Sequence, residues 1–130
     1  MTNLEIIENL YKAFAVVDVP NVLANINIDI IWNEAEHFPY SDNNPYTGLQ
    51  LVLKGVFARC MSEWECFAAN LTTSYDAGDN IIATGWYAGK NIITGNEMSP
   101  QAVHIWSLNN GEIVKFQQYI DTLNVNNALI

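Results

Sequence analysis

The chain has 130 residues, half of them hydrophobic and 15% charged, which suffices for one globular domain with its own core. Fourteen Asp and Glu oppose five Lys and Arg, and the net charge of −9 argues against binding to nucleic acids or anionic membrane surfaces. No apolar run approaches the ~18 residues of a membrane span, and the first residues lack the basic and apolar regions of a secretion signal. We therefore expect a single soluble, cytoplasmic domain over residues 1–130, in which Cys60 and Cys66 are thiols.

Two helices are predicted at the start of the chain. Thr2 and Glu5 form a capping box ahead of apolar residues at helical spacing, so the first helix is expected to extend to about Val17. Asp18 is the expected N-cap of a short second helix, because Pro20 lies in its first turn and apolar residues follow at helical spacing.

A strand and a third helix are predicted next. Residues 28–34 are rich in β-prone residues and indicate a strand, and residues 35–46 form an irregular, aromatic segment that contains prolines. Thr47 and Gln50 form a second capping box, which predicts a helix that reaches about residue 63.

The second half of the chain has the pattern of strands. Four are predicted, at residues 65–75, 81–88, 100–108 and 112–122. The last two form a hairpin, because the turn at 109–111 contains Asn-Gly, which tolerates the positive φ of tight turns.

The order of these elements, with helices early and strands late, predicts an α+β fold. We expect a curved, cone-shaped antiparallel sheet, with the three N-terminal helices over one face. A pocket inside the cone follows from this arrangement.

Three segments carry a resemblance to a known family: the strand end Trp32-Asn33-Glu34, the helix start Pro45-Tyr46-Thr47-Gly48, and the hairpin from His104 that closes in Tyr119-Ile120-Asp121-Thr122. The chain resembles the nuclear transport factor 2-like (cystatin-like) superfamily, and within it the SnoaL-like polyketide cyclases and ketosteroid isomerase relatives. The resemblance covers nearly the whole chain. It implies the fold and leaves the chemistry open, because the superfamily includes both enzymes and binding domains.

The resemblance implies which reactions to expect. In ketosteroid isomerases a carboxylate base matches Glu34, but the same register puts Leu10 at the position of a donor tyrosine and Val103 at that of a protonated aspartate, so steroid isomerisation is not expected. Limonene epoxide hydrolase-like enzymes also need an Arg-x-Asp pair, which residues 84–88 lack, although Asp121 matches their last acid.

The pattern of the SnoaL-like cyclases is present. These enzymes use one aspartate at a strand end as acid and base, with histidine and amide groups nearby, and the matching residues are Asp121, His104 and Asn33. Together with Glu34, the first two are the candidate catalytic residues.

Strand alternation bears on Glu34 directly. It shares a face with Ile28, Ile30 and Trp32, so an acid ends an apolar stripe, which is costly unless the acid is used or paired. In the alternative, Glu34 lies beyond the strand end and is solvated.

The other two candidates have a less favourable alternation. Asp121 lies on the other face of its strand from Phe116, so it reaches the pocket only if the strand end is bulged. Otherwise it caps the strand or pairs with Lys115. His104 lies on the other face of its strand from Val103, so the register above points it away from the pocket. It would then be a structural histidine in a dimer interface.

The remaining expectations concern the ligand and the assembly. The residues expected to contact a ligand are Trp32, Asn33, Tyr46, Trp86, Phe116 and Gln118. No spacing matches a metal site, and no cofactor is expected.

Two functions follow from these observations. The first is a cofactor-independent isomerase, cyclase or dehydratase that acts on a small apolar or carbonyl compound through acid–base carboxylates. The alternative is a non-catalytic domain that binds a small hydrophobic ligand or mediates dimerisation. Under both, a homodimer formed through the sheet is expected.

Overall fold

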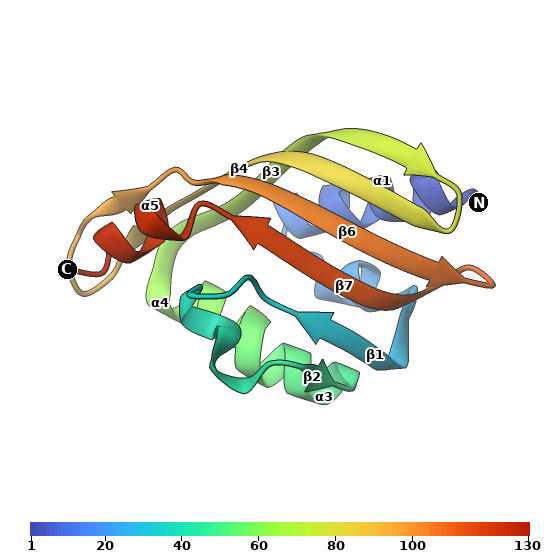
Figure 1. The fold of residues 1–130 in the computed structure, drawn as a ribbon, viewed down its shortest axis with the longest axis horizontal. Helices are drawn as coiled ribbons and strands as arrows, with labels where there is room; N and C mark the ends of the chain where they lie inside the picture. The colour runs from blue at the N-terminus through green and yellow to red at the C-terminus, as the bar shows by residue number, and fades with distance from the viewer.

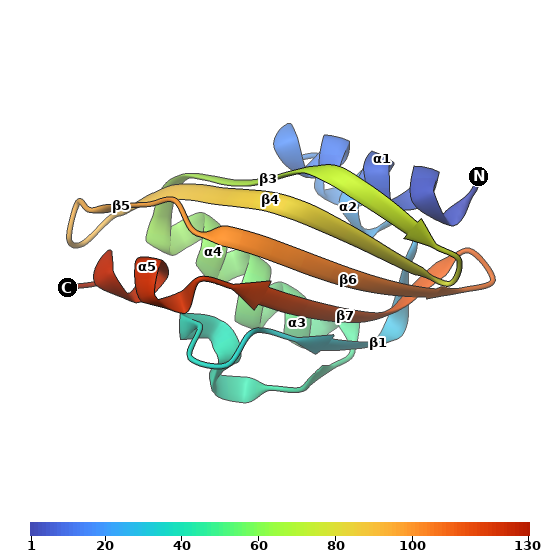
Figure 2. The same ribbon diagram turned by 45° about the horizontal axis from the view of Figure 1, so that its top comes forward.

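The computed structural model describes all 130 residues and consists of a curved sheet with helices along one side (Figures 1 and 2). The predicted α+β class is confirmed. Two side-chain caps are also confirmed: Thr2 and Glu5 form the capping box of α1 (Asn3–Ala15), and Asp18 accepts a hydrogen bond from the backbone of Asn21 at the start of α2 (Val19–Leu23). None of the helices combines the length and the apolar character that crossing a membrane requires.

The third helical segment starts differently from the prediction. Thr47 lies in a short strand, β2 (Tyr46–Thr47), and the N-cap is Gly48, without a side-chain hydrogen bond. Gly48 has a φ of 102°, a conformation that glycine adopts readily, and its N–H bonds to the carbonyl of Ile30. The capping box predicted for Thr47 and Gln50 is therefore wrong, because pairing with the first strand holds Thr47 extended.

This helical segment is continuous but contains one wider turn. It consists of α3 (Leu49–Val52), the π-helical turn η2 (Leu53–Phe57) and α4 (Ala58–Glu63). The preceding segment, predicted as irregular, contains a 3-10 helix, η1 (Pro39–Asn43).

Seven strands form a single sheet. In chain order they are β1 (Ile26–Asn33), β2, β3 (Trp64–Ala77), β4 (Asn80–Asn91), β5 (Glu97–Met98), β6 (Gln101–Asn109) and β7 (Glu112–Ile120). The order across the sheet is β2-β1-β7-β6-β4-β3, and β5 pairs with β4. β1 and β7 run parallel, whereas every other pair is antiparallel, so the sheet is mixed. The two parallel strands are far apart in the chain, so no hairpin forces them to be antiparallel.

Two details change which side chains reach the interior. The register of β1 shifts between Ile26 and Ile31, so Ile26 is buried while Ile28, predicted on the buried face, is 70% exposed. After β7 the chain forms a helix that was not predicted, α5 (Thr122–Asn127).

The middle of β4 approaches β3 so closely that only glycine fits there. A Cβ atom on Gly85 would lie 2.1 Å from the backbone oxygen of Asn70, where β3 changes register. We expect Gly85→Ala to lower the free energy of unfolding by about 3 kcal/mol, because backbone atoms must move. Urea unfolding measures this. The control is Gly89→Ala in the same strand, whose Cβ would meet the flexible end of Met98 first; equal losses in both variants would contradict the prediction.

Candidate active site

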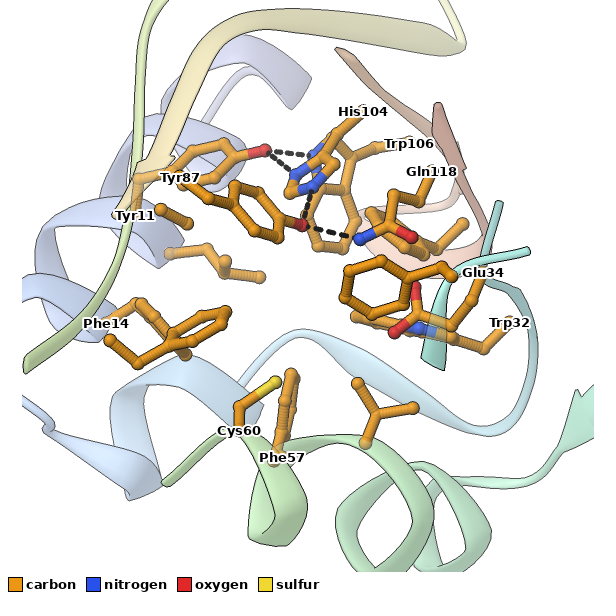
Figure 3. Close-up of a pocket in the computed structure, with 16 residues that line it drawn as sticks. Tyr11, Phe14, Trp32, Glu34, Phe57, Cys60, Tyr87, His104, Trp106 and Gln118 are labelled. Carbon is orange, nitrogen blue, oxygen red and sulfur yellow. Dashed lines mark hydrogen bonds between the residues drawn. The ribbon is translucent and has the colours of Figure 1, made fainter. Parts of the chain in front are cut away.

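A cavity of about 50 Å³ lies between the helices and the sheet (Figure 3). Sixteen residues line it, and thirteen of them are hydrophobic. The exceptions are Glu34, His104 and Gln118. Because polar side chains are costly to bury without partners, these three define the chemistry of the cavity.

Glu34 directly follows β1, and its backbone is held on both sides by one amide. Its N–H donates to Oδ1 of Asn44 (3.0 Å), and Nδ2 of Asn44 donates to its carbonyl oxygen (2.7 Å). The side chain is only 3% exposed, and Oε2 has no hydrogen-bond partner. The predicted position of Glu34 at the end of the buried stripe is confirmed, and the solvated alternative is wrong.

Burial sets the charge state of this acid. It raises the pKa of Glu34 to about 8, and the Trp32 indole and the Arg59 guanidinium offset the effect only in part. The indole nitrogen of Trp32 is itself buried without a well-aligned partner. Glu34 also lines a second, polar cleft of about 600 Å³ that opens to solvent. It therefore stands between a dry cavity and water, and it gains or loses its proton near neutral pH.

Opposite this acid, a buried histidine bridges two tyrosines. Nδ1 of His104 lies 2.6 Å from the hydroxyl of Tyr11, and Nε2 lies 2.5 Å from the hydroxyl of Tyr87. The indole N–H of Trp106 donates to the Tyr11 hydroxyl (2.9 Å). Burial lowers the pKa of His104 to about 3 and raises the pKa of both tyrosines, so all three are neutral at pH 7.

Gln118 on β7 connects this chain of hydrogen bonds to the backbone beside Glu34. Its Oε1 accepts from the N–H of Ala35 (3.0 Å), and its Nε2 donates to the Tyr87 hydroxyl (2.9 Å). The backbone donor fixes the orientation of the amide. The cavity thus holds one acid whose Oε2 has no hydrogen-bond partner and, across from it, an ordered and neutral hydrogen-bond network.

Comparison with solved structures assigns the family. No protein-family model matches the chain, and no curated protein matches it in sequence. A nuclear transport factor 2-like protein from Burkholderia thailandensis E264 is 32% identical over 100% of this chain and 98% of its own, with a TM-score of 0.94. The chain belongs to the nuclear transport factor 2-like proteins.

More distant structures share the fold. A nuclear transport factor 2-like protein of unknown function from Burkholderia pseudomallei K96243 is 22% identical over 97% of this chain and 95% of its own, with a TM-score of 0.86. A hypothetical protein with a ketosteroid isomerase-like fold, from Catenulispora acidiphila DSM 44928, is 18% identical over 92% of this chain and 86% of its own, with a TM-score of 0.72. These likenesses confirm the predicted fold and name no reaction.

In this nuclear transport factor 2-like protein, the predicted direction of His104 is wrong. His104 and Trp106 point into the cavity, and Ala102 is buried on the same face of β6, whereas Val103 is on the outer face of the sheet. On α1, the hydroxyl of Tyr11 reaches His104. The hydrogen-bonding side chains of the cavity are thus Tyr11 and His104, each one residue after Leu10 and Val103 in the chain.

Asp121 does not reach the cavity. It is exposed and caps α5, where its Oδ1 accepts from the backbone N–H of Asn124 (3.2 Å). The bulge that would turn it inward is absent, because the irregularity of the β6–β7 pair lies at the other end, between Ser107 and Leu108. The predicted position of Asp121 in the cavity is therefore wrong.

Three of the six predicted ligand contacts line the cavity, and three do not. Those that line the cavity are Trp32, Phe116 and Gln118. Asn33 lines the outer polar cleft, and Trp86 is 55% exposed on the far side of the sheet. Tyr46 is buried away from the cavity, where its hydroxyl donates to the backbone oxygen of Tyr40 (2.7 Å).

Tyr11 and Tyr87 form hydrogen bonds in the cavity and were not among the predicted site residues, and the direction of Tyr87 could have been predicted. Alternation along β4 places it on the same face as Ile81 and Ala83, which are fully buried. That pattern was a usable signal for its direction. Its partner His104 lies on the neighbouring strand, and only the pairing of β4 with β6 brings the two together.

Two aromatic rings separate the cavity from an outer groove. Phe14 and Phe57, with ring centroids 6.2 Å apart, line both the cavity and an entirely apolar groove of about 230 Å³ between the helices. A protein cavity that binds benzene has a volume of about 150 Å³. A ligand of that size therefore needs these rings to move. No group of three or more His, Cys, Asp or Glu side chains is placed to hold a metal ion.

Proposed function

We propose that this protein is a cofactor-independent enzyme in which Glu34 moves a proton on a small, neutral carbonyl compound. The observation that carries the proposal is the buried carboxyl of Glu34, which lines both the apolar cavity and the polar cleft and has no hydrogen-bond partner on Oε2. Such a poised acid is typical of general acid–base sites.

In the proposed reaction, ionised Glu34 takes a proton from the carbon next to the carbonyl. The electron pair of the broken C–H bond forms a C=C bond to the carbonyl carbon, and the π pair of the C=O bond moves onto the oxygen, which becomes an enolate oxygen. Glu34, now protonated, returns the proton to the same carbon or to a conjugated one. Return to the same carbon gives hydrogen exchange when the proton on Glu34 has first been replaced by one from solvent, whereas return to a conjugated carbon gives isomerisation. One carboxyl suffices for both.

The size of the cavity limits the substrate. At about 50 Å³ it is far smaller than a steroid, and its walls offer no cation to pair with an anionic substrate. A compact ketone or enone, admitted by movement of Phe14 and Phe57, fits these limits best.

The direct test is deuterium exchange into cyclopentanone in D₂O, followed by proton NMR. We expect the protein to exchange the protons beside the carbonyl faster than buffer at the same pH. An exchange rate equal to that of buffer would contradict the enzyme and favour the second candidate, a binding domain for small hydrophobic molecules, which the thirteen hydrophobic lining residues support.

We further propose that the protein forms a homodimer through the outer face of the sheet. Strand pairing places Val103 beside Tyr119 and Ile105 beside Ile82, while Trp86 nearby is 55% exposed. None of these five side chains is charged. Two chains that each carry a charge of −9 repel each other, so an uncharged, apolar face is the surface at which they approach most easily.

Tyr119→Asp is expected to convert the dimer to a monomer, because the 55% exposed tyrosine would be replaced by a charge at the interface. Light scattering after gel filtration distinguishes the two states, since one chain has a mass of 14.6 kDa. The control is Ile93→Asp, at an 89% exposed position between β4 and β5. A monomeric wild type, or a Tyr119→Asp variant that stays dimeric, would contradict the proposal.

A further inference from the structure

The chain Tyr11–His104–Tyr87 contains more protons than its hydrogen bonds use. Each tyrosine hydroxyl has one proton, and a neutral imidazole has one N–H, which makes three protons. Only two hydrogen bonds join the three side chains, one at Nδ1 and one at Nε2. One hydroxyl proton therefore has no acceptor among these three side chains.

The neighbours of the two hydroxyls do not accept this proton. The indole of Trp106 can only donate, and it donates to Tyr11. Gln118 has its oxygen engaged by the backbone of Ala35 and presents its NH₂ group to Tyr87. Neither hydroxyl has another hydrogen-bond partner in the protein, so the free proton is available to a ligand.

The tautomer of His104 decides which hydroxyl is free. With the proton on Nδ1, the imidazole donates to Tyr11 and accepts from Tyr87, and the free proton belongs to Tyr11. With the proton on Nε2, the imidazole donates to Tyr87 and accepts from Tyr11, and the free proton belongs to Tyr87. Moving one proton on His104 thus moves the donor from one tyrosine to the other.

Of the two hydroxyls, that of Tyr87 is the better placed to act with Glu34. It lies between His104 and Gln118, on the side of the cavity where Glu34 lies (Figure 3). Gln118 in turn is bonded to Ala35, the residue after Glu34. The charge of Glu34 raises the pKa of Tyr87 and has no such effect on Tyr11.

We propose that His104 is a tautomeric switch that presents the free hydroxyl proton at Tyr87 to an oxygen acceptor of the ligand, so that the cavity selects neutral carbonyl compounds over hydrocarbons of the same shape. The inference rests on the proposed function only in taking the ligand to be a carbonyl compound. His104 is a positioning residue in this scheme, and Tyr87 contacts the ligand. A buried donor without an acceptor is costly, and a ligand oxygen removes that cost.

The test is the tautomer of His104, read from the ¹⁵N resonances of its imidazole at pH 6, where Glu34 is protonated. The probe is cyclopentanone, and cyclopentene is the matched compound without an acceptor. We expect saturating cyclopentanone to shift His104 to the Nε2–H form, because Tyr87 must then accept from Nε2 while donating to the ketone. Cyclopentene should leave the tautomer unchanged.

Two variants test the asymmetry between the tyrosines. Tyr87→Phe should weaken cyclopentanone binding roughly fivefold and leave cyclopentene binding unaltered. Tyr11→Phe removes a hydroxyl from the same network but should keep the ketone-dependent tautomer shift. An unchanged tautomer at saturation, a ketone that does not bind, or equal affinity losses in the two variants would overturn the switch.

These measurements are independent of catalysis. If the protein shows the tautomer shift but exchanges no ketone protons, the proposed reaction is contradicted and the switch is supported. If the protein exchanges ketone protons without the tautomer shift, the reaction is supported and the switch is contradicted.

Discussion

Glu34→Gln is expected to lower the rate of ketone proton exchange by roughly 10²- to 10⁴-fold, the range typical of removing a general base. The amide has nearly the same shape as the acid and fills the same space between the cavity and the polar cleft, but it cannot take up a proton. Binding of the ketone should change far less than the rate. Proton NMR in D₂O gives the exchange rate, and circular dichroism checks the fold.

The matched control is Glu8→Gln, which removes the same charge at an exposed position on α1, outside the cavity and the polar cleft. Its rate should equal that of the wild type. The wild-type rate should also rise about tenfold per pH unit and level off above a pH of about 8, because the base acts when ionised and burial raises the pKa of Glu34 to about 8. A Glu34→Gln variant with half the wild-type rate would exclude Glu34 as the base.

The same substitution is expected to stabilise the protein near neutral pH. The pKa of Glu34 rises from 4.5 to about 8 on folding, so between these values the folded state holds a proton that the unfolded state releases, and stability falls as the pH rises. At pH 7 the raised pKa of Glu34 lowers the free energy of unfolding by about 3 kcal/mol, and Gln avoids this loss because it does not ionise. Glu34→Gln should therefore exceed the wild type in free energy of unfolding by about 3 kcal/mol at pH 7 and match it near pH 4.

Urea unfolding at pH 4, 5.5, 7 and 8.5 measures this difference. Glu8→Gln should follow the wild type throughout. His104 contributes with the opposite sign, because its pKa falls from 6.5 to about 3 on folding, and the stability it provides is lost as the pH drops through this range. That contribution is common to both proteins and cancels in the comparison. A difference that does not grow with pH would show that Glu34 is ionised without cost, and so is not buried as described.

Inactivation combined with stabilisation is informative in itself. A structural acid is expected to stabilise the fold when ionised, whereas a base kept for chemistry carries a cost that the fold bears. The paired measurements on Glu34→Gln therefore separate the two roles without knowledge of the natural substrate.

Local patterns in the sequence determined the long helices and strands and the position of the acid. The capping box of Thr2 and Glu5, the cap at Asp18 and the Asn-Gly hairpin turn depend on residues within a few positions of each other, and all three are present in the structure. The alternation of Ile30, Trp32 and Glu34 likewise spans a single strand and gave their buried side correctly, whereas Ile28, before the shift in register, is exposed. Periodicity carries this information because burial repeats every second residue along a strand.

Only the tertiary structure decided how the groups of the site meet. The register between β4, β6 and β7 brings Tyr87, His104 and Gln118 together, and a displacement by one residue would have turned His104 outward. Asp121 lies outside the cavity because the chain turns into α5 at that point, and Thr47 is extended because β1 pairs with it. These outcomes depend on contacts between segments that are far apart in the chain, where single-residue shifts reverse a side chain and local spacing gives no signal.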